Sequence, residues 1–297
     1  MGVMKQPSDS ISLKSPNHDL GVTFLAEPTV AVIESSWSPY KVSRVTMAKQ
    51  VYETFAGSHV TDAMLVEAAK LFSENYGIWG ERSHQPGKHV MLSAPRLRSQ
   101  YLPSTAATSY VRVVVDGTLA GNVFACRWEY KGKTVCWVTQ LVVDKEYRER
   151  GLASGLLRSL RLNVDDVYGI MSSHPAACLA AAACFGTTIE KVPLDFIAEN
   201  ADLLMKSSPI RYIHDAKLCG SLFNTEDSTG LVSGVDTGFF VDHGEPLEAL
   251  SLVRETWNWP LGELPDGHEY LLIVQGKHRR SRSRSVPKST DQHLSGN

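Results

Sequence analysis

The chain has 297 residues, of which 43% are hydrophobic and 21% are charged, and its formal net charge is -2. This apolar fraction supports a sizeable core and excludes a globally disordered chain, and the length suits one large domain or two small ones. The balanced charge argues against a protein built around nucleic-acid binding.

The five cysteines are odd in number and include no C-x-x-C pair. Two lie in strand-like runs (Cys126, Cys136) and two in an alanine-rich helical run (Cys178, Cys184), so we expect buried thiols, with no disulfide framework and no metal site. The first residues are polar without an apolar signal core, and no apolar run is long enough to span a bilayer. We therefore expect a cytoplasmic protein, with a nuclear location as the alternative, and no membrane partner.

The first part of the chain is predicted to form a flexible leader, a strand, a long helix, an aromatic loop and a short helix, in this order: 1–20, 22–34, 62–73, 75–79 and 95–101. Pro28 interrupts the strand. The long helix has apolar residues at helical spacing, and either Thr61 or Asp62 can cap it.

The middle of the chain is predicted to form three antiparallel strands in a row, then a helix, a strand and a second helix: 110–116, 118–130, 134–143, 152–163, 167–173 and 175–185. Asp116-Gly117 joins the first two strands as a two-residue hairpin turn, because glycine adopts positive φ at little cost. A second turn, at 131–133, joins the next two.

The last part is predicted to form a helix, a loop-rich stretch, a strand, a helix and a final strand: 194–207, 208–235, 237–241, 246–257 and 269–275. This order favours an α+β fold with a mixed, mostly antiparallel sheet flanked by helices. We expect a leader (1–20), a single domain (21–276) with an insertion at about 187–235, and a basic tail (277–297).

The segment from Thr139 to Arg158 contains Arg148-x-x-Gly151-x-Ala153, directly after an apolar strand and before an amphipathic helix. Glycine permits a tight turn and the close approach of a ligand. The N–H groups and the dipole at a helix N-terminus favour an anion such as phosphate. Arg148 and Arg150 add positive charge, so the segment predicts a phosphate-binding loop.

This motif resembles motif A of the GNAT acetyltransferase superfamily, and the order of the surrounding elements is similar to that fold over roughly residues 105–190. The resemblance implies an N-acetyltransferase that passes the acetyl group of acetyl-CoA directly to an amine in a ternary complex. It implies that main-chain N–H groups of the loop bind the diphosphate of acetyl-CoA: Arg148, Glu149, Arg150, Gly151, Leu152, Ala153 and Ser154. It also implies that the preceding strand, near a β-bulge, binds the pantetheine arm through Leu141, Val142 and Val143, and that the main-chain N–H of Leu141 or Val142 supports the oxyanion.

The family commonly places a tyrosine, which protonates the departing thiolate, on the helix after the next strand. By position this residue is Ala181, and the helix contains no tyrosine. His174, which opens that helix, is a candidate acid, base or CoA contact; its other interpretation is a helix cap.

The acceptor amine needs a base, and the strand of motif A has no carboxylate between Cys136 and Val143. The candidates are Glu129 near the end of the previous strand and Asp242, with His243, after the strand at 237–241. Residues in such places are more often solvated strand ends. Tyr76 and Trp79, after the first long helix, are expected either in the acceptor pocket or in the core.

The tail contains six Lys or Arg residues and one Asp after Gly276, with alternating Arg and Ser. It is interpreted as a disordered basic tail, with nuclear import or nucleic-acid contact as the alternative. Two other functions therefore stay open: a non-catalytic CoA-binding module, which Ala181 favours, and an interaction protein that acts through the tail. The acceptor is expected to be a small-molecule amine or a protein amine.

Overall fold

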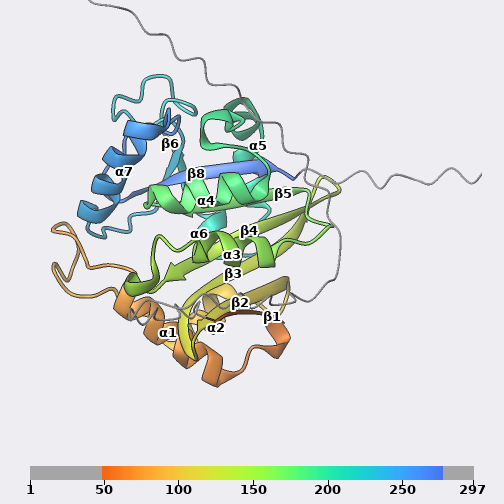
Figure 1. Cartoon of the computed structure of the whole chain (residues 1–297). Coiled ribbons are helices and arrows are strands. Elements are labelled where there is room, and N and C mark those ends of the chain that lie inside the picture. The colour runs from red at the N-terminus through yellow and green to blue at the C-terminus, as the bar shows by residue number, and fades with distance from the viewer. Residues whose placement is uncertain (1–48, 277–297) are drawn as a thin grey trace, which may run out of the picture. The chain divides into compact units, whose positions relative to one another are not determined.

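The computed structural model describes residues 49–276. The leader, the strand predicted at 22–34 and the basic tail lie outside the described residues. One eight-stranded sheet with the strand order β1-β2-β3-β4-β5-β8-β7-β6 forms the centre of this part (Figure 1). Its strands are β1 (Gln50–Ala56), β2 (Ala107–Val115), β3 (Thr118–Tyr130), β4 (Lys133–Val143), β5 (Val167–Ser172), β6 (Lys217–Cys219), β7 (Gly234–Asp236) and β8 (His268–Gln275).

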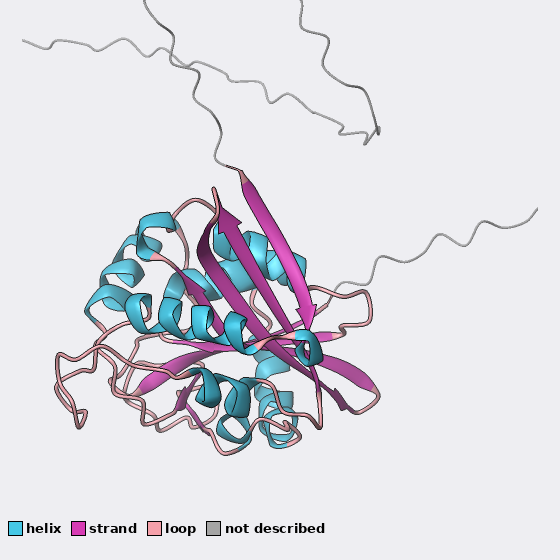
Figure 2. Ribbon diagram, turned by 90° about the horizontal axis from the view of Figure 1, so that it is seen from below, coloured by secondary structure: helices cyan, strands magenta, loops and turns pink. Residues whose placement is uncertain are grey.

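Helices cover both faces of the sheet (Figure 2). The α-helices are α1 (Asp62–Asn75), α2 (Ala94–Tyr101), α3 (Leu152–Leu160), α4 (Pro175–Phe185), α5 (Leu194–Lys206), α6 (Arg211–His214) and α7 (Gly244–Thr256). None of the helices within residues 49–276 is long and apolar enough to cross a membrane.

The sheet is mixed and mostly antiparallel, as predicted. Only β4 and β5 are parallel, and α3 connects them. The hairpins form where the sequence places residues that accept positive φ: Asp116 and Gly117 have φ of 49° and 88°, and Lys131 and Gly132 have φ of 50° and 71°. Positive φ at both central residues matches the twist of the strands.

Alternating residues of the first strands pack against different helices. Tyr110 and Phe124 belong to a hydrophobic cluster with α1 and α2, whereas Val111 and Val123 belong to a larger cluster with α3 and α4. Side chains of a strand point alternately to its two faces, so the apolar pattern fixes which helices cover which face. Figure 1 shows α3 and α4 side by side in front of the strands.

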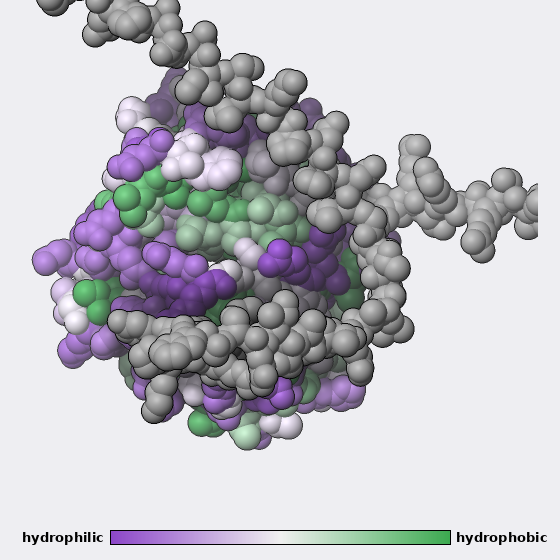
Figure 3. Space-filling model, viewed as in Figure 1, coloured by the Kyte–Doolittle hydropathy of each residue, from purple (hydrophilic) through white to green (hydrophobic). Residues whose placement is uncertain are grey.

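The α4 helix has the sequence PAACLAAAACF, without a charged residue. Figure 3 shows a hydrophobic band over this region, where Leu179 and Ala183 are on the outer side. All five cysteines are free, and burial raises the pKa of the Cys178 thiol to about 12. Such a thiol stays protonated at neutral pH and is a poor nucleophile.

A buried ion pair joins β3 to the loop before β5. The Arg127 guanidinium donates to both carboxylate oxygens of Asp165, at 2.7 and 3.1 Å, and the backbone N–H of Leu162 also donates to that carboxylate at 2.8 Å. The two charged side chains are 6% and 0% exposed. Removing one partner of such a pair strongly lowers the stability of the fold, because the other charge then stays buried without a counter-charge.

The structure corrects the sequence prediction in three regions. The strand predicted at 237–241 is wrong: the strand is β7, at Gly234–Asp236, and Gly238 with φ of 61° follows it. Only a single bridge to Trp79 remains at Val241. Secondary structure was also missed at β1, whose seven residues are exposed or only partly buried. Within the stretch predicted as loop-rich it was missed at α6 and β6, because a helix of four residues and a strand of three have little periodicity.

Candidate active site

A β-bulge in β4 opens the sheet next to β5. Phe124 on β3 faces Gln140, and the next residue, Ala125, faces Val138, so Thr139 is the extra residue on β4. The pairing of β4 with β5 ends at Val138 and Ile170. A bulge bends its strand and increases the local twist, and here the two parallel strands separate beyond it.

The backbone of β4 beyond the bulge presents donors to this gap. The N–H of Asp144 donates to the carbonyl of Ala120 on β3, at 2.9 Å. Successive residues of an antiparallel strand direct their N–H groups to opposite sides. Leu141 and Val143 therefore direct theirs away from β3 toward the gap, and Val142 directs its N–H toward β3.

The loop before α3 ends in an open helix N-terminus. Gly151 has φ of 76° and occupies the N-cap position without a side-chain cap. The bond from the Gly155 N–H to the Gly151 carbonyl (3.0 Å) is the first of the helix, so the N–H groups of Leu152, Ala153 and Ser154 have no acceptor within α3. A Cβ atom on Gly151 would meet nothing within 4 Å, so the space beside it is open.

The two arginines of this loop have different environments. Arg148 donates to the carbonyls of Val143 (3.3 Å) and Asn75 (2.7 Å) and pairs with Glu245 at the start of α7. Its guanidinium therefore ties β4, α1 and α7 together. Arg150 is exposed and lies over the Tyr147 ring, 5.3 Å from its centroid, which leaves its charge accessible to a ligand. Glu149 is also exposed, with φ of 61°.

His174 caps α4. Its Nδ1 accepts from the N–H of Ala176 at 3.2 Å, and its Nε2 lies 3.4 Å from the Glu245 carboxylate. The hydrogen bond with His174, together with the charge of Arg148, lowers the pKa of Glu245 to about 2 against the effect of partial burial. Glu245 is thus an anion at any physiological pH, and it holds both basic side chains.

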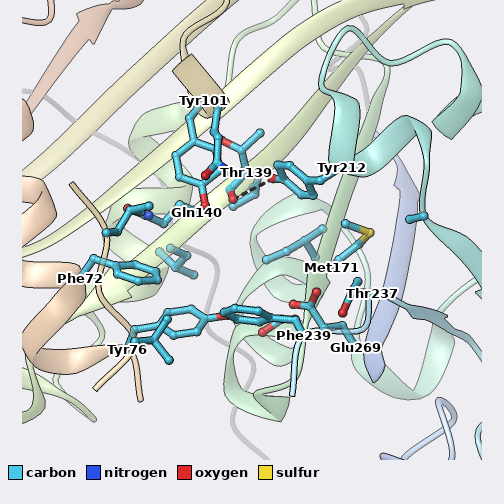
Figure 4. A pocket seen from close by; sticks show the side chains of 18 of the residues that line it. Phe72, Tyr76, Tyr101, Thr139, Gln140, Met171, Tyr212, Thr237, Phe239 and Glu269 are labelled. Atoms are coloured by element: carbon cyan, nitrogen blue, oxygen red, sulfur yellow. Dashed lines mark hydrogen bonds between the residues drawn. The ribbon is translucent and has the colours of Figure 1, made fainter. Parts of the chain in front are cut away.

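A cavity of about 500 Å³ lies at the bulge (Figure 4). It is lined by residues of the bulged strand and of β5, including Thr139, Gln140, Leu141 and Met171, and by aromatic residues from elsewhere: Phe72, Tyr76, Trp79, Tyr101, Tyr212 and Phe239. The structure thus brings together Leu141, Tyr76 and Trp79 of the residues singled out in the sequence.

Glu269, near the start of β8, is a carboxylate of this cavity that sequence reasoning missed, as are Asp215 and Asp236. The Glu269 side chain lies beside Thr237 and close to Phe239 (Figure 4). Burial raises the pKa of Glu269 from 4.5 to about 7, an effect that the Thr237 side chain partly offsets. A general base is most effective when its pKa is near the working pH. The available signal was one acidic residue in the apolar strand HEYLLIVQ.

The carboxylates chosen from the sequence lie elsewhere. Glu129 is exposed near the β3–β4 hairpin and does not line the cavity. Asp242 is exposed, and its carboxylate accepts from the N–H of Gly244 at 3.0 Å, next to the start of α7. His243 is buried, which lowers its pKa, and is not part of the lining either.

Tyrosines reach the cavity from the residue that follows α1, from α2 and from α6 instead of from α4, whose Ala181 is fully buried. The Tyr212 hydroxyl donates to the carbonyl of Thr139, the bulge residue, at 3.0 Å. Loss of hydration raises the pKa of Tyr101 to about 12 and raises those of Tyr76 and Tyr212 well above their usual value, so all three phenols keep their protons. Within residues 49–276, no group of three His, Cys, Asp or Glu side chains is suited to hold a metal ion.

Comparison with solved structures finds distant similarity to acetyltransferases. An aminoglycoside acetyltransferase from an uncultured soil metagenomic sample is 12% identical, over 37% of this chain and 66% of that one, with a TM-score of 0.28. The ribosomal-protein-S18-alanine N-acetyltransferase from Escherichia coli is 13% identical, over 46% and 77%, with a TM-score of 0.32. A GNAT-family acetyltransferase from Streptococcus pneumoniae is 16% identical, over 48% and 93%, with a TM-score of 0.32. This chain thus spans just under two thirds of the metagenomic enzyme.

Comparison with curated protein sequences finds no match. The model of the acetyltransferase (GNAT) family, however, matches residues 71–161, which run from the second half of α1 to the end of α3. This range includes the bulged strand β4 and the loop around Gly151. The chain therefore contains a GNAT acetyltransferase domain at residues 71–161.

Proposed function

We propose that the protein is an N-acetyltransferase that transfers an acetyl group from acetyl-CoA to an amine by direct attack. One observation supports this most strongly. Residues of both strands beyond the last β4–β5 pair, Leu141 and Met171, line the cavity that contains Glu269, and β4 continues directly into the loop that ends at the open N-terminus of α3. An anionic donor and an amine acceptor can therefore meet at a single point of the sheet.

The residues present suit the donor. The N–H groups of Leu152, Ala153 and Ser154, with the charge of Arg150, are suited to the diphosphate. The N–H groups of Leu141 and Val143, directed into the gap, are suited to the amide arm. Acetyl-CoA brings the reactive thioester, and every other group needed for transfer can come from the chain.

We assign roles to three residues of the cavity. Glu269 takes a proton from the ammonium group, which frees the nitrogen lone pair for attack on the thioester carbon. The Leu141 N–H supports the negative charge on the carbonyl oxygen. As the C–N bond forms and the C–S bond breaks, Tyr212 supplies a proton to the departing sulfur and regains one when the amide nitrogen loses its second proton.

The test is calorimetric titration of acetyl-CoA into the full chain and two variants at one position. Gly151→Ala and Gly151→Trp both strain the backbone at φ of 76°, but only the indole fills the open space beside α3. We expect micromolar binding by the wild type and by Gly151→Ala, and no binding by Gly151→Trp. A folded wild-type protein that does not bind acetyl-CoA would refute the transferase.

A non-catalytic CoA-binding module is the second candidate, and Ala181 at the family's tyrosine position is the observation that favours it. Saturable acetyl-CoA binding without CoA release, across a broad panel of amines, would support the module. Amine-dependent release of CoA that Glu269→Gln abolishes would support the enzyme.

A further inference from the structure

Aromatic side chains form two opposite walls of the cavity. Tyr101 and Tyr212 lie on one side, with ring centroids 6.1 Å apart. Phe239 lies on the other side and contacts both Tyr76 and Trp79, at 6.0 and 5.0 Å between centroids. Aromatic walls of this kind bind apolar bodies and attract cations to their ring faces.

The charged groups of the lining are mostly acidic. Glu269, Asp236 and Asp215 line the cavity, against one cation, Arg96. Asp215 pairs with Arg211 and His214, and the carboxylate of Asp236 accepts from the N–H of Gly238 at 3.0 Å.

Glu269 makes no ion pair with another described residue, and its side chain lies beside Phe239, Met171 and Thr237 (Figure 4). A desolvated carboxylate is best stabilised by a cation. An ammonium group would serve this purpose there, and an anionic acceptor would be repelled.

The two aromatic walls themselves offer a large hydrophilic acceptor few polar partners; the other polar side chains of the lining include Gln100, Gln140 and Ser172. The carboxamide of Gln140 is 6% exposed, lies close to the Tyr101 hydroxyl, and completes no standard hydrogen bond through its nitrogen or its oxygen within the described chain. A buried amide of this kind can serve one or two polar atoms of a ligand. A polyhydroxylated acceptor would lose more bonds to water than these walls replace.

From these observations we infer that the acceptor is a primary amine, bound as its ammonium ion, on a compact aromatic or otherwise apolar body. The ammonium group lies at Glu269 and the body lies between the two aromatic walls. This inference rests on the proposed transferase function and specifies its substrate class. Phe239 is the residue that sets this preference, since it contacts aromatic residues of α1 and of the following loop and adjoins Glu269.

The first experiment measures kcat/KM for CoA release by the full chain with phenethylamine, spermidine, glucosamine and a short lysine peptide. We expect phenethylamine to exceed spermidine and glucosamine by at least about tenfold, the effect of one well-buried aromatic contact. Phe239→Ala should lower kcat/KM for phenethylamine by about tenfold or more without changing the affinity for acetyl-CoA. Equal or better turnover of glucosamine, spermidine or the peptide would overturn the inference.

Phe240→Ala is the matched control. Phe240 is the next residue, but its ring lies under the Arg82 guanidinium, 5.0 Å from it, and does not line the cavity. This variant should keep the wild-type preference among amines. A loss equal to that of Phe239→Ala would show that the loop and not the wall matters, and would also overturn the inference.

A second experiment keeps the two proposals distinguishable. Thermal denaturation is followed with phenethylamine and, separately, with phenylpropionate, which has a similar body and the opposite charge. We expect only the amine to raise Tm, and the rise should vanish in Glu269→Gln. Acetyl-CoA binding without any stabilisation by the amine would overturn the substrate class and leave the transferase standing. Amine binding without acetyl-CoA binding would refute the transferase, and the amine would then be a ligand of the cavity and not an acceptor.

Discussion

Replacing Glu269 with glutamine should change how the stability of the protein depends on pH. Glutamine keeps the size and shape of the side chain and removes its titration. The pKa of Glu269 rises from 4.5 in the unfolded chain to about 7 in the folded one, chiefly because burial disfavours the carboxylate. The neutral carboxyl therefore contributes stability that is fully present below pH 4.5 and is lost as the pH rises through about 7.

The two pKa values fix the size of the effect. The full difference between the two pKa values corresponds to a change of up to about 3 kcal/mol in the free energy of unfolding. Between about pH 5.5 and about pH 8, linkage predicts that Glu269 lowers the free energy of unfolding by about 2 kcal/mol. The glutamine variant lacks this contribution, so the stability difference between variant and wild type should shift by the same amount in favour of the variant.

Urea denaturation at both pH values measures this shift. Glu129→Gln is the matched control, since Glu129 is exposed on β3 and does not line the cavity; its curve should follow that of the wild type at both pH values. If Glu269→Gln also followed the wild type, the carboxyl would titrate normally and the argument for a base poised near neutrality would fail.

Ionisation of the same carboxylate, which lowers stability as the pH rises, should raise the rate of acetyl transfer. The base must be ionised, so kcat/KM should rise with pH through about 7 and Glu269→Gln should lose about 10²-fold or more. Arg150→Ala should weaken acetyl-CoA binding by about 3- to 10-fold with little loss of stability, because its charge is exposed. Arg148→Ala, measured by urea denaturation, should instead cost about 1–3 kcal/mol, because three contacts of a charged group are lost. Asp165→Asn should cost about 3–5 kcal/mol in the same assay, since it leaves a buried arginine unpaired. Ala181→Tyr should lower stability by about 1–3 kcal/mol through overpacking and should not raise kcat. Faster transfer by a stable variant would show that a tyrosine on α4 can act as the general acid, against the role given to Tyr212.

The sequence alone predicts those features of the fold that depend on residues close together in the chain. The β3 boundaries follow from two turns that need positive φ, at Asp116-Gly117 and at 131–132. The sequence narrowed the cap of α1 to Thr61 or Asp62, and in the structure the Thr61 hydroxyl accepts from the N–H of Met64 at 3.2 Å. Likewise the open N-terminus of α3 follows from Gly151 between an apolar strand and an amphipathic helix. Each is a local rule of backbone and side-chain chemistry.

The rest of the candidate site depends on contacts between distant segments. Glu269 reaches the bulge because β8 pairs with β5, so that Tyr270 faces Ser172, and no local pattern predicts this pairing. The ion pair of Arg148 is formed with Glu245, which lies 97 positions further along the chain. A motif can place a charge in a loop, but only tertiary structure decides whether an internal carboxylate has already neutralised it.

The missing tyrosine of α4 has an explanation in the packing of that helix. Ala177 lines the cavity, and Ala181, one turn further on the same face, is fully buried in the core. A phenol there would have to displace core side chains before it could reach the gap. Tyr212 lies on α6, which the loop-rich prediction for 208–235 missed, and its hydroxyl already bonds to the bulge of β4. If the reaction needs a phenolic acid, this fold can supply it from the segment between α5 and β6, which would give part of the expected insertion a direct role in the chemistry.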